Sequence, residues 1–424
     1  MNTISAELEN KARAAREASR ALRKLSTDVK NRALLNIALA LEEEQGPVLE
    51  ANAHDYQAGQ AEGLSEAMLD RLLLTPERLA AMAADVRSVA ALPDPVGESF
   101  DARTLPNGLQ VARRRVPIGV IGAVYESRPN VTVDISALCL KSGNAVILRG
   151  GSEAAHSNAA LAHLVRQGIA RAGAPEDAVQ FIESTDRALV QQMLKLDRYI
   201  DLIIPRGGAG LIQFVAREAT MPVVTGGIGV CHTYVDRAAD MGKAVAIAYN
   251  AKVQRPTVCN SLDTLLVHAD TAPRLLPQIA REWGKAGVEM RCDSRALSIV
   301  APLEEVRAVP ASPDDWGKEF LALIAAVRVV DSLDEALEHI ERYGSGHSEA
   351  IVTEDYAAAM RFLDEVDAAA VYVNASTRFT DGAQFGLGAE VAISTNRLHA
   401  RGPMGLRELT TYKWTILGTG QTRP

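Results

Sequence analysis

The spacing of hydrophobic positions predicts helices over the first hundred residues. Apolar residues recur there three or four positions apart, which is the period of one helix face, as at Leu8, Ala12, Ala15, Leu22 and Leu25, and again at Leu34, Ile37, Ala38 and Leu41. Pro47, Gly63 and Pro76 interrupt this pattern, as expected at helix boundaries. A run at 93–97 (PDPVG) ends it.

The pattern changes to alternation over residues 104–116. The pair Asn107-Gly108 lies between two alternating segments, which favours a tight β-hairpin. The three arginines at 113–115 follow it. We interpret this run as a solvated or subunit-facing side of a projecting strand, because the chain as a whole is acidic.

From about residue 116, short apolar runs alternate with helical stretches. Predicted buried strands in the first block cover 118–125, 145–148, 178–182, 199–204 and 221–224. A second block contains predicted strands at 261–267, 325–330 and 370–373, and the tail at 408–417 reads as another strand. Strand–helix alternation predicts parallel sheets covered by helices, with ligands at the carboxyl ends of the strands.

Composition narrows the class of protein. The chain has 424 residues and a net charge of −8, so we expect more than one domain and no general affinity for nucleic acid. No apolar run reaches the length of a membrane span or signal peptide, so we expect neither membrane insertion nor secretion. Four cysteines lie far apart without a C-x-x-C pair. This spacing fits a reducing cytoplasm and predicts no metal site.

One cysteine lies in a polar loop with the sequence NAKVQRPTVCN at 250–260, immediately before a predicted strand. Lys252 and Arg255 precede Cys259 in this loop, and nearby positive charge favours the nucleophilic thiolate. The alternative is a buried structural cysteine, but such residues usually have apolar surroundings. The loop therefore predicts an enzyme with a covalent acyl intermediate.

Two glycine-rich turns follow predicted strands and open helices, as expected of a phosphate site. They lie at 148–153 (LRGGSE) and 204–210 (IPRGGAG). Neither has a G-x-G-x-x-G or Walker A spacing. Together they favour a dinucleotide site, and Arg149 is suited to a ribose 2′-phosphate, which favours NADPH over NADH.

Several further motifs carry a resemblance to a known family. They are PIGVIG at 117–122, ESRPN at 126–130, SGNAVILRGG at 142–151, YGSGHS at 343–348, VNASTRF at 373–379 and HARGPMG at 399–405. With the Cys259 loop, their order and spacing resemble the aldehyde dehydrogenase superfamily, and within it the enzymes that reduce L-glutamyl 5-phosphate in proline biosynthesis.

The resemblance implies an α/β fold with two Rossmann-like parallel domains and a small β oligomerisation unit. On this basis residues 1–100 and 117–235 are expected to form the NADP-binding domain, and 236–402 the catalytic domain with the cysteine. Residues 101–116 and 403–424 are expected to supply the oligomerisation hairpin and C-terminal strand.

The implied activity is NADPH-dependent reduction of L-glutamyl 5-phosphate to L-glutamate 5-semialdehyde, through a cysteine thioester and with release of phosphate. Members that hydrolyse their thioester carry a water-activating glutamate where this chain has Val224, which suits a reductase. Two alternatives remain: another acylating enzyme, dependent on coenzyme A or phosphate, and a non-catalytic scaffold that retains the fold.

The resemblance and the local motifs together define the expected site residues. The catalytic residues are Cys259 and Asn130, the latter as a substitute oxyanion donor beside the Cys259 backbone N–H. The cofactor-binding residues are Arg149, Gly150, Gly151, Ser152, Arg206, Gly207, Gly208, Gly226, Gly227 and Glu319. The substrate-binding residues are Arg128, Lys252, Arg255, Ser376, Thr377, Arg378 and Arg401. His347 and His399 are further candidates for acid–base groups, with simple hydrogen bonding as the alternative for a loop histidine.

The expected partners follow from the same resemblance. We expect a small-molecule substrate and a homodimer or homotetramer. A transient contact with glutamate 5-kinase, which makes the acyl phosphate, is a further open expectation.

Overall fold

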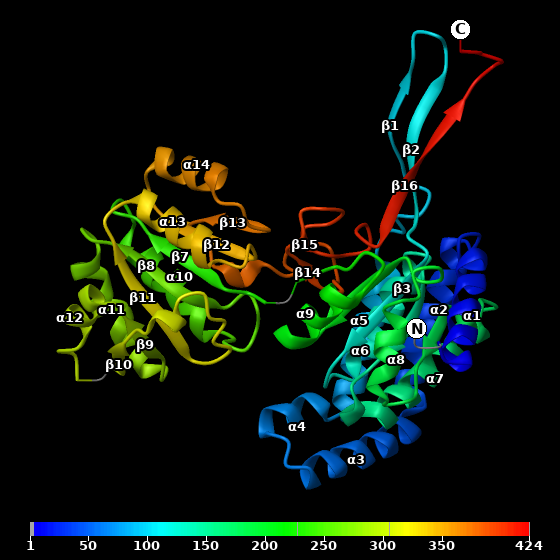
Figure 1. The fold of residues 1–424 in the computed structure, drawn as a ribbon, viewed down its shortest axis with the longest axis horizontal. Helices are drawn as coiled ribbons and strands as arrows, with labels where there is room; N and C mark the ends of the chain where they lie inside the picture. The colour runs from blue at the N-terminus through cyan, green and yellow to red at the C-terminus, as the bar shows by residue number, and fades with distance from the viewer. Residues whose placement is uncertain (1–3, 227, 305, 424) are drawn as a thin grey trace. The chain divides into compact units, whose positions relative to one another are not determined.

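The computed structural model describes residues 4–226, 228–304 and 306–423. The chain forms two compact units that interleave along the sequence. Unit 1 comprises Met1–Thr225, Gly386–Ala392 and Met404–Pro424, and unit 2 comprises Gly226–Phe385 and Ile393–Pro403. Each unit is built around its own parallel sheet (Figure 1).

Unit 1 begins with helices, which confirms the expectation from the periodic N-terminal pattern. They are α1 (Ala6–Leu22), α2 (Thr27–Glu43), α3 (Gln45–Ala61), α4 (Glu66–Leu72) and α5 (Pro76–Ala91). Side-chain oxygens of Ser5, Ser26, Ser65 and Thr75 accept backbone N–H groups at the starts of α1, α2, α4 and α5. These caps satisfy donors that a helix start otherwise leaves without partners.

The sheet of unit 1 has four parallel strands in the order β5-β4-β3-β6. These strands are β3 (Val120–Tyr125), β4 (Ala145–Arg149), β5 (Val179–Phe181) and β6 (Leu202–Arg206), and the helices around them are α6 (Asn130–Lys141), α7 (Ala155–Arg171), α8 (Arg187–Met193) and α9 (Ala209–Glu218). Residues 221–224, expected as a strand, form only an isolated bridge between Val223 and Ile203.

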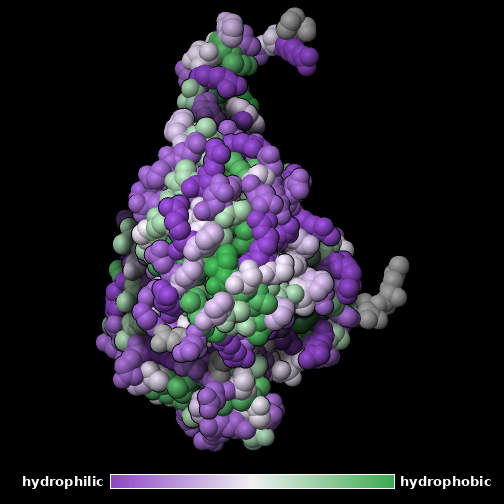
Figure 2. All heavy atoms as spheres, turned by 90° about the vertical axis from the view of Figure 1, so that its left-hand side faces the viewer, coloured by the Kyte–Doolittle hydropathy of each residue, from purple (hydrophilic) through white to green (hydrophobic). Residues whose placement is uncertain are grey.

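A separate three-stranded sheet confirms the predicted hairpin and tail strand. It is antiparallel, with the order β1-β2-β16, and its strands are β1 (Ser99–Thr104), β2 (Gln110–Pro117) and β16 (Thr410–Leu417). Gly108 has φ +84° in the connecting turn, a conformation that glycine adopts without steric cost. Hydrophobic residues lie on the surface of this sheet, at the top of Figure 2.

Unit 2 contains a seven-stranded parallel sheet with the order β10-β9-β11-β8-β7-β12-β13. Its strands are β7 (Cys231–Val235), β8 (Leu262–His268), β9 (Glu289–Cys292), β10 (Ala308–Pro310), β11 (Ile324–Val330), β12 (Ser348–Val352) and β13 (Ala370–Val373). The predicted domain boundary at 235 is therefore too late by one strand, because β7 pairs with β8 and β12 of unit 2.

Helices cover both faces of this sheet. They are α10 (Met241–Val253), α11 (Ala272–Lys285), α12 (Ser294–Val300), α13 (Leu333–Tyr343) and α14 (Tyr356–Glu365), and a short pair β14 (Ile393–Ser394) and β15 (Gly402–Pro403) completes the unit. Leu265 and Leu266 of β8 belong to two different core clusters, as expected for successive strand residues. No helix in the described ranges is long and apolar enough to cross a membrane.

Candidate active site

Cys259 lies in unit 2, in the loop between α10 and β8, and is half-buried. The other three cysteines are buried. Burial raises the pKa of Cys292 to about 12, and raises the pKa values of Cys139 and Cys231 as well, so these groups remain thiols at neutral pH. Cys259 is therefore the cysteine whose position suits a nucleophile.

The backbone of Cys259 is held by close packing beneath it. A Cβ on Gly229 would lie 1.5 Å from the Cys259 carbonyl oxygen, so only glycine allows this approach. The Cys231 Sγ donates a hydrogen bond of 3.2 Å to the same oxygen. The Gly229 N–H in turn donates to Glu319 Oε1 at 3.0 Å. Sequence reasoning missed Gly229 and Cys231 as parts of this support.

Glu319 is the residue that the resemblance assigned to the cofactor ribose. Its carboxylate accepts the Gly229 N–H, and burial raises its pKa. The structure therefore places Glu319 one hydrogen bond from the glycine beneath Cys259. The ribose contact stays a prediction.

A second set of contacts ties the Cys259 loop to residues 376–380. The Asn260 side-chain amide donates to the carbonyl oxygens of Thr380 at 2.8 Å and Arg378 at 3.3 Å. The Thr377 hydroxyl donates to the Asn260 carbonyl at 2.8 Å, and the Ser376 hydroxyl accepts the Arg378 N–H. The hydroxyls expected to bind substrate thus support the loop that carries Arg378.

Arg378 brings positive charge to the cysteine. Its Nε donates to Gln254 Oε1 at 2.8 Å. Its pKa is lowered by burial and by the neighbouring Arg255 guanidinium, whereas a thiolate at Cys259 acts to raise it. Two of the predicted substrate cations, Arg255 and Arg378, therefore lie within electrostatic reach of each other, and Arg378 lies within reach of the nucleophile.

Two other cations that were predicted to bind the substrate, Lys252 and Arg401, form ion pairs elsewhere in the structure. Lys252 is fully buried, and its Nζ donates to the Leu262 carbonyl at 2.8 Å and pairs with Asp263 at 3.6 Å. Arg401 pairs with Asp367 at 2.6 Å. Lys252 is therefore part of the core beneath the loop, which residue type alone could not show.

Replacing Lys252 by alanine is expected to lower the free energy of unfolding by about 3–5 kcal/mol, because it leaves the Asp263 carboxyl buried without its partner. Burial already raises the pKa of Asp263 to about 7 and lowers that of Lys252. Arg255→Ala, at an exposed position in the loop just after α10, is the matched control and should change stability by no more than about 0.5 kcal/mol. Urea denaturation measures both. Equal stability of the two variants would contradict the buried role of Lys252.

His347 is not placed to act as an acid or base at neutral pH. Burial lowers its pKa to about 4, and its Nδ1 lies 2.8 Å from the Ser348 hydroxyl. The ring is therefore uncharged and engaged in the interior of unit 2.

The first glycine-rich turn of unit 1 joins β4 to α7. Arg149 is 7% exposed, and its guanidinium donates to the carbonyls of Gly150 at 2.6 Å and Thr185 at 2.9 Å. Its Nε is buried without a hydrogen-bond partner. A Cβ on Gly150 would lie 2.1 Å from the Asn158 side-chain amide, and one on Gly151 would clash with Glu153. Ser152 begins the short 3-10 turn before α7.

The second glycine-rich turn joins β6 to α9, and N–H donors in it form hydrogen bonds to other residues of this chain. The Gly208 N–H donates to Glu126 Oε2 at 2.8 Å, and a Cβ on Gly207 would clash with the same carboxylate. Arg206 Nη1 donates to the Val391 carbonyl. A carboxylate of this chain thus occupies the position at the helix start where a cofactor phosphate was expected.

The surroundings of the remaining predicted site residues are as follows. The Asn130 amide donates to Asp134 Oδ2 at 2.8 Å, where burial raises the pKa of Asp134 to about 6. Arg128 is exposed in the loop before α6, and Val224 is buried. Gly226 packs against the Ile393 carbonyl. The predicted residue Gly227 lies outside the described residues.

The fold and these residues define a class of protein. The model of the aldehyde dehydrogenase family matches residues 2–299 and 306–415. The chain belongs to the aldehyde dehydrogenase family, as its sequence motifs indicate.

Similar proteins narrow this class further. The chain is 62% identical over 417 residues to the gamma-glutamyl phosphate reductase of Dehalococcoides mccartyi (strain CBDB1), covering 98% of each chain. It is 58% identical to the enzyme of that name from Roseiflexus castenholzii, covering 98% of this chain and 99% of the other. The crystal structure of gamma-glutamyl phosphate reductase from Thermotoga maritima has a TM-score of 0.96 and 51% identity, covering 99% of this chain and 100% of that one. Within the family, the chain groups with the gamma-glutamyl phosphate reductases.

Proposed function

We propose that this protein reduces L-glutamyl 5-phosphate to L-glutamate 5-semialdehyde and phosphate, a step towards proline. The observation that carries the proposal is Cys259, a half-buried cysteine whose loop is tied to Arg378. The name of the relatives that match over nearly the whole chain supports the same substrate.

The reaction begins with attack of the Cys259 thiolate on the acyl carbon. The bond from that carbon to the phosphate oxygen breaks, phosphate leaves, and a γ-glutamyl thioester forms on Sγ. NADPH supplies a hydride when bound. The reduced thiohemiacetal then collapses to the aldehyde and restores the thiolate. An acyl phosphate is already activated, so the protein supplies position and charge rather than a strong base.

Arg378 and Arg255 have the charge that this reaction requires. Their guanidinium groups stabilise the thiolate and can bind the dianionic leaving phosphate through paired N–H donors. The Cys259 backbone N–H is the proposed donor to the oxyanion. Ser376 and Thr377 act by positioning the Arg378 segment, since their hydroxyls already bond to backbone groups.

Members of the family use a nicotinamide cofactor, and the residues after β4 fit one. Arg149 offers an unpartnered buried Nε beside two glycines, and a Cβ at the first of them, Gly150, would lie 2.1 Å from the Asn158 side-chain amide. We expect this cation to bind the ribose 2′-phosphate that distinguishes NADPH from NADH.

Replacing Arg149 by alanine should raise the KM for NADPH by about 10–100-fold, the loss of one charge-assisted contact. The KM for NADH should change much less, because that cofactor lacks the 2′-phosphate. Steady-state kinetics with both cofactors make this comparison. A parallel rise in both values would mean that Arg149 does not discriminate between them.

The substrate can be tested in the reverse direction. Phosphate-dependent reduction of NADP⁺ should be fastest with glutamate 5-semialdehyde in a panel of aldehydes, and coenzyme A should not replace phosphate. A preference for another aldehyde, or turnover with coenzyme A, would identify a different acylating enzyme. We place the reaction in the cytoplasm, where a transient contact with glutamate 5-kinase would shorten the exposure of the labile acyl phosphate to water.

The three-stranded sheet is the proposed surface for self-association into a dimer or tetramer. One face of β16 exposes Tyr412, Trp414 and Ile416 by 44–56%, and Arg113 stacks on the first two rings at 4.8 and 4.9 Å. Exposed apolar side chains on an edge strand favour pairing with another chain.

Ile416→Asp is therefore expected to dissociate the oligomer, because it buries a charge in the proposed interface. Thr411→Asp is the matched control, since residues 411 and 416 lie on opposite faces of β16. Light scattering after size-exclusion chromatography measures the mass of each variant. An unchanged mass for Ile416→Asp would exclude this face as the interface.

A further inference from the structure

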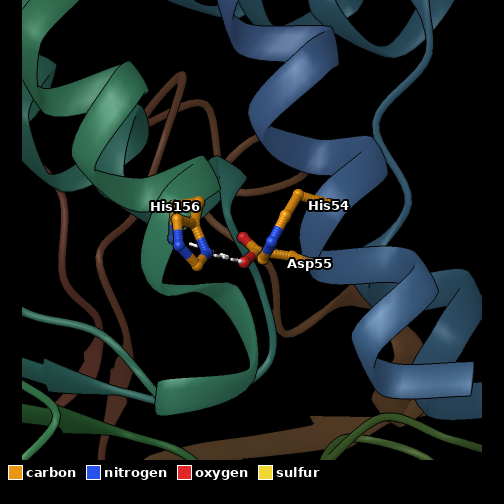
Figure 3. Close-up of side chains that lie close together, drawn as sticks. All are labelled: His54, Asp55 and His156. Carbon is orange, nitrogen blue, oxygen red and sulfur yellow. Dashed lines mark hydrogen bonds and ion pairs between the residues drawn. The ribbon is translucent and has the colours of Figure 1, made fainter. Parts of the chain in front are cut away.

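Two histidines and one aspartate meet where α3 packs against α7 in unit 1 (Figure 3). His54 and Asp55 are successive residues of α3, and His156 is the second residue of α7. One ligand atom from each residue lies within 4.8 Å of the others. The pair His156 and Asp55 is 101 residues apart in the sequence, so no local motif indicates this cluster.

Asp55 is the buried anchor of the group, with a side chain 3% exposed. Its Oδ2 accepts the Ser157 N–H at 2.7 Å and the Ser157 hydroxyl at 2.6 Å. These contacts cap α7, whose own N-cap residue Ala154 has no side-chain hydrogen bond. Oδ1 accepts the His156 backbone N–H at 3.3 Å and lies 2.7 Å from His156 Nδ1.

His54 has no such structural task. Its ring centroid lies 4.3 Å from that of His156, with an angle of 57° between the planes, and its nitrogens make no hydrogen bond within the described part of the chain. Both imidazoles are exposed. Capping of α7 accounts for the burial of Asp55 and for its hydrogen bonds to Ser157. It does not account for the exposed imidazole of His54 beside the same carboxylate.

We propose that His54, Asp55 and His156 form a binding site for a divalent transition metal ion of the Zn²⁺ type. Two imidazoles and one carboxylate oxygen are ligands that Zn²⁺ accepts, and a water completes a tetrahedral set. Mg²⁺ and Ca²⁺ prefer oxygen ligands and do not fit this pair of nitrogens. On binding, His156 takes the tautomer with its proton on Nε2, and the ion lies between the freed Nδ1 and Asp55 Oδ1, which are now 2.7 Å apart.

The start of α7 carries a positive partial charge that opposes a cation. The Asp55 carboxylate offsets this charge, and its Oδ2 keeps both Ser157 contacts while Oδ1 turns to the metal. The ion would then join α3 to α7 where the Asp55 carboxylate and the Asn52–Ser157 hydrogen bond already connect them. The expected consequence is a metal-dependent rise in the stability of unit 1, separate from the chemistry of Cys259.

The test is calorimetric titration of the full-length protein with Zn²⁺ alone, in a Cys259→Ser background so that the half-buried thiol cannot bind the ion. We expect one ion per chain and a higher unfolding temperature with Zn²⁺. His54→Ala and His156→Ala should each weaken binding at least about tenfold, since each removes one of three ligands. Both variants keep Asp55 and the backbone of α7, so the helix cap is preserved.

His163→Ala is the matched control, because His163 is an exposed histidine on the same helix. It should bind Zn²⁺ as tightly as the parent protein. The proposal is overturned if the parent shows no saturable binding, if either His54→Ala or His156→Ala binds normally, or if His163→Ala loses binding to the same extent.

Discussion

Replacing Cys259 by serine is expected to lower turnover by roughly four orders of magnitude, because the hydroxyl is a far weaker nucleophile at neutral pH and forms no thioester. Cofactor affinity should remain within about twofold, since the predicted cofactor residues after β4 belong to unit 1. Stopped assays of turnover and fluorescence titration with NADPH measure these two quantities.

Cys292→Ala provides the control for this result. Cys292 lies in the core of unit 2, so its loss should lower stability but leave turnover near normal below the unfolding temperature. If Cys259→Ser retained turnover within tenfold of the parent, the covalent mechanism would be wrong.

The second large loss of activity is expected from adding one methyl group at Gly229, which packs against the backbone of Cys259. In Gly229→Ala, the new Cβ would lie 1.5 Å from the Cys259 carbonyl oxygen, so the Cys259 loop must move. A shift of about 1 Å in a reacting group lowers the rate by roughly 100-fold. We therefore expect kcat to fall by about that factor.

Gly46→Ala is the matched control, because a Cβ at Gly46 meets no atom within 4 Å. Its kcat should equal that of the parent. Alkylation of Cys259 by iodoacetamide provides a second measurement, and its rate should fall in Gly229→Ala but not in Gly46→Ala. Normal kcat in Gly229→Ala would show that the support beneath Cys259 does not position it.

Most of the fold could be predicted because it depends on local periodicity. The helical pattern before residue 92, the Asn107-Gly108 hairpin and the runs that became β3, β4, β8 and β11 are all visible in a short window of sequence. The three-residue strand β10 is not, because its strand character comes from pairing with β9. The predicted domain boundary at residue 235 was misplaced for the same reason, because β7 belongs to unit 2 through its pairing with β8 and β12.

In the candidate site too, residues close together in the sequence could be predicted, whereas residues brought together only by the fold could not. Cys259 and Arg255 share one polar loop, so their chemistry could be inferred from neighbours in sequence. Gly229 and Glu319 come from segments 90 residues apart, and no pattern connects them. Lys252 had the charge expected of a phosphate ligand, but its burial is decided by packing against β8 and Asp263.

Glu126 illustrates a further limit. A glycine turn before a helix predicts an anion site, but sequence does not reveal which anion contacts it. At Gly208 the structure supplies a carboxylate of this chain. The turn at Gly150 keeps a buried cation with an unpartnered nitrogen, and this difference favours it as the cofactor contact.

The most direct test of the account is a rapid-mixing measurement with glutamate 5-semialdehyde and NADP⁺ in the absence of phosphate. If the acyl group is held on Cys259, one equivalent of NADPH per active site should form in a burst, and steady turnover should begin only when phosphate is added. Cys259→Ser should show neither phase. Absence of a burst in the parent protein, or a full burst in Cys259→Ser, would contradict a thioester on this cysteine.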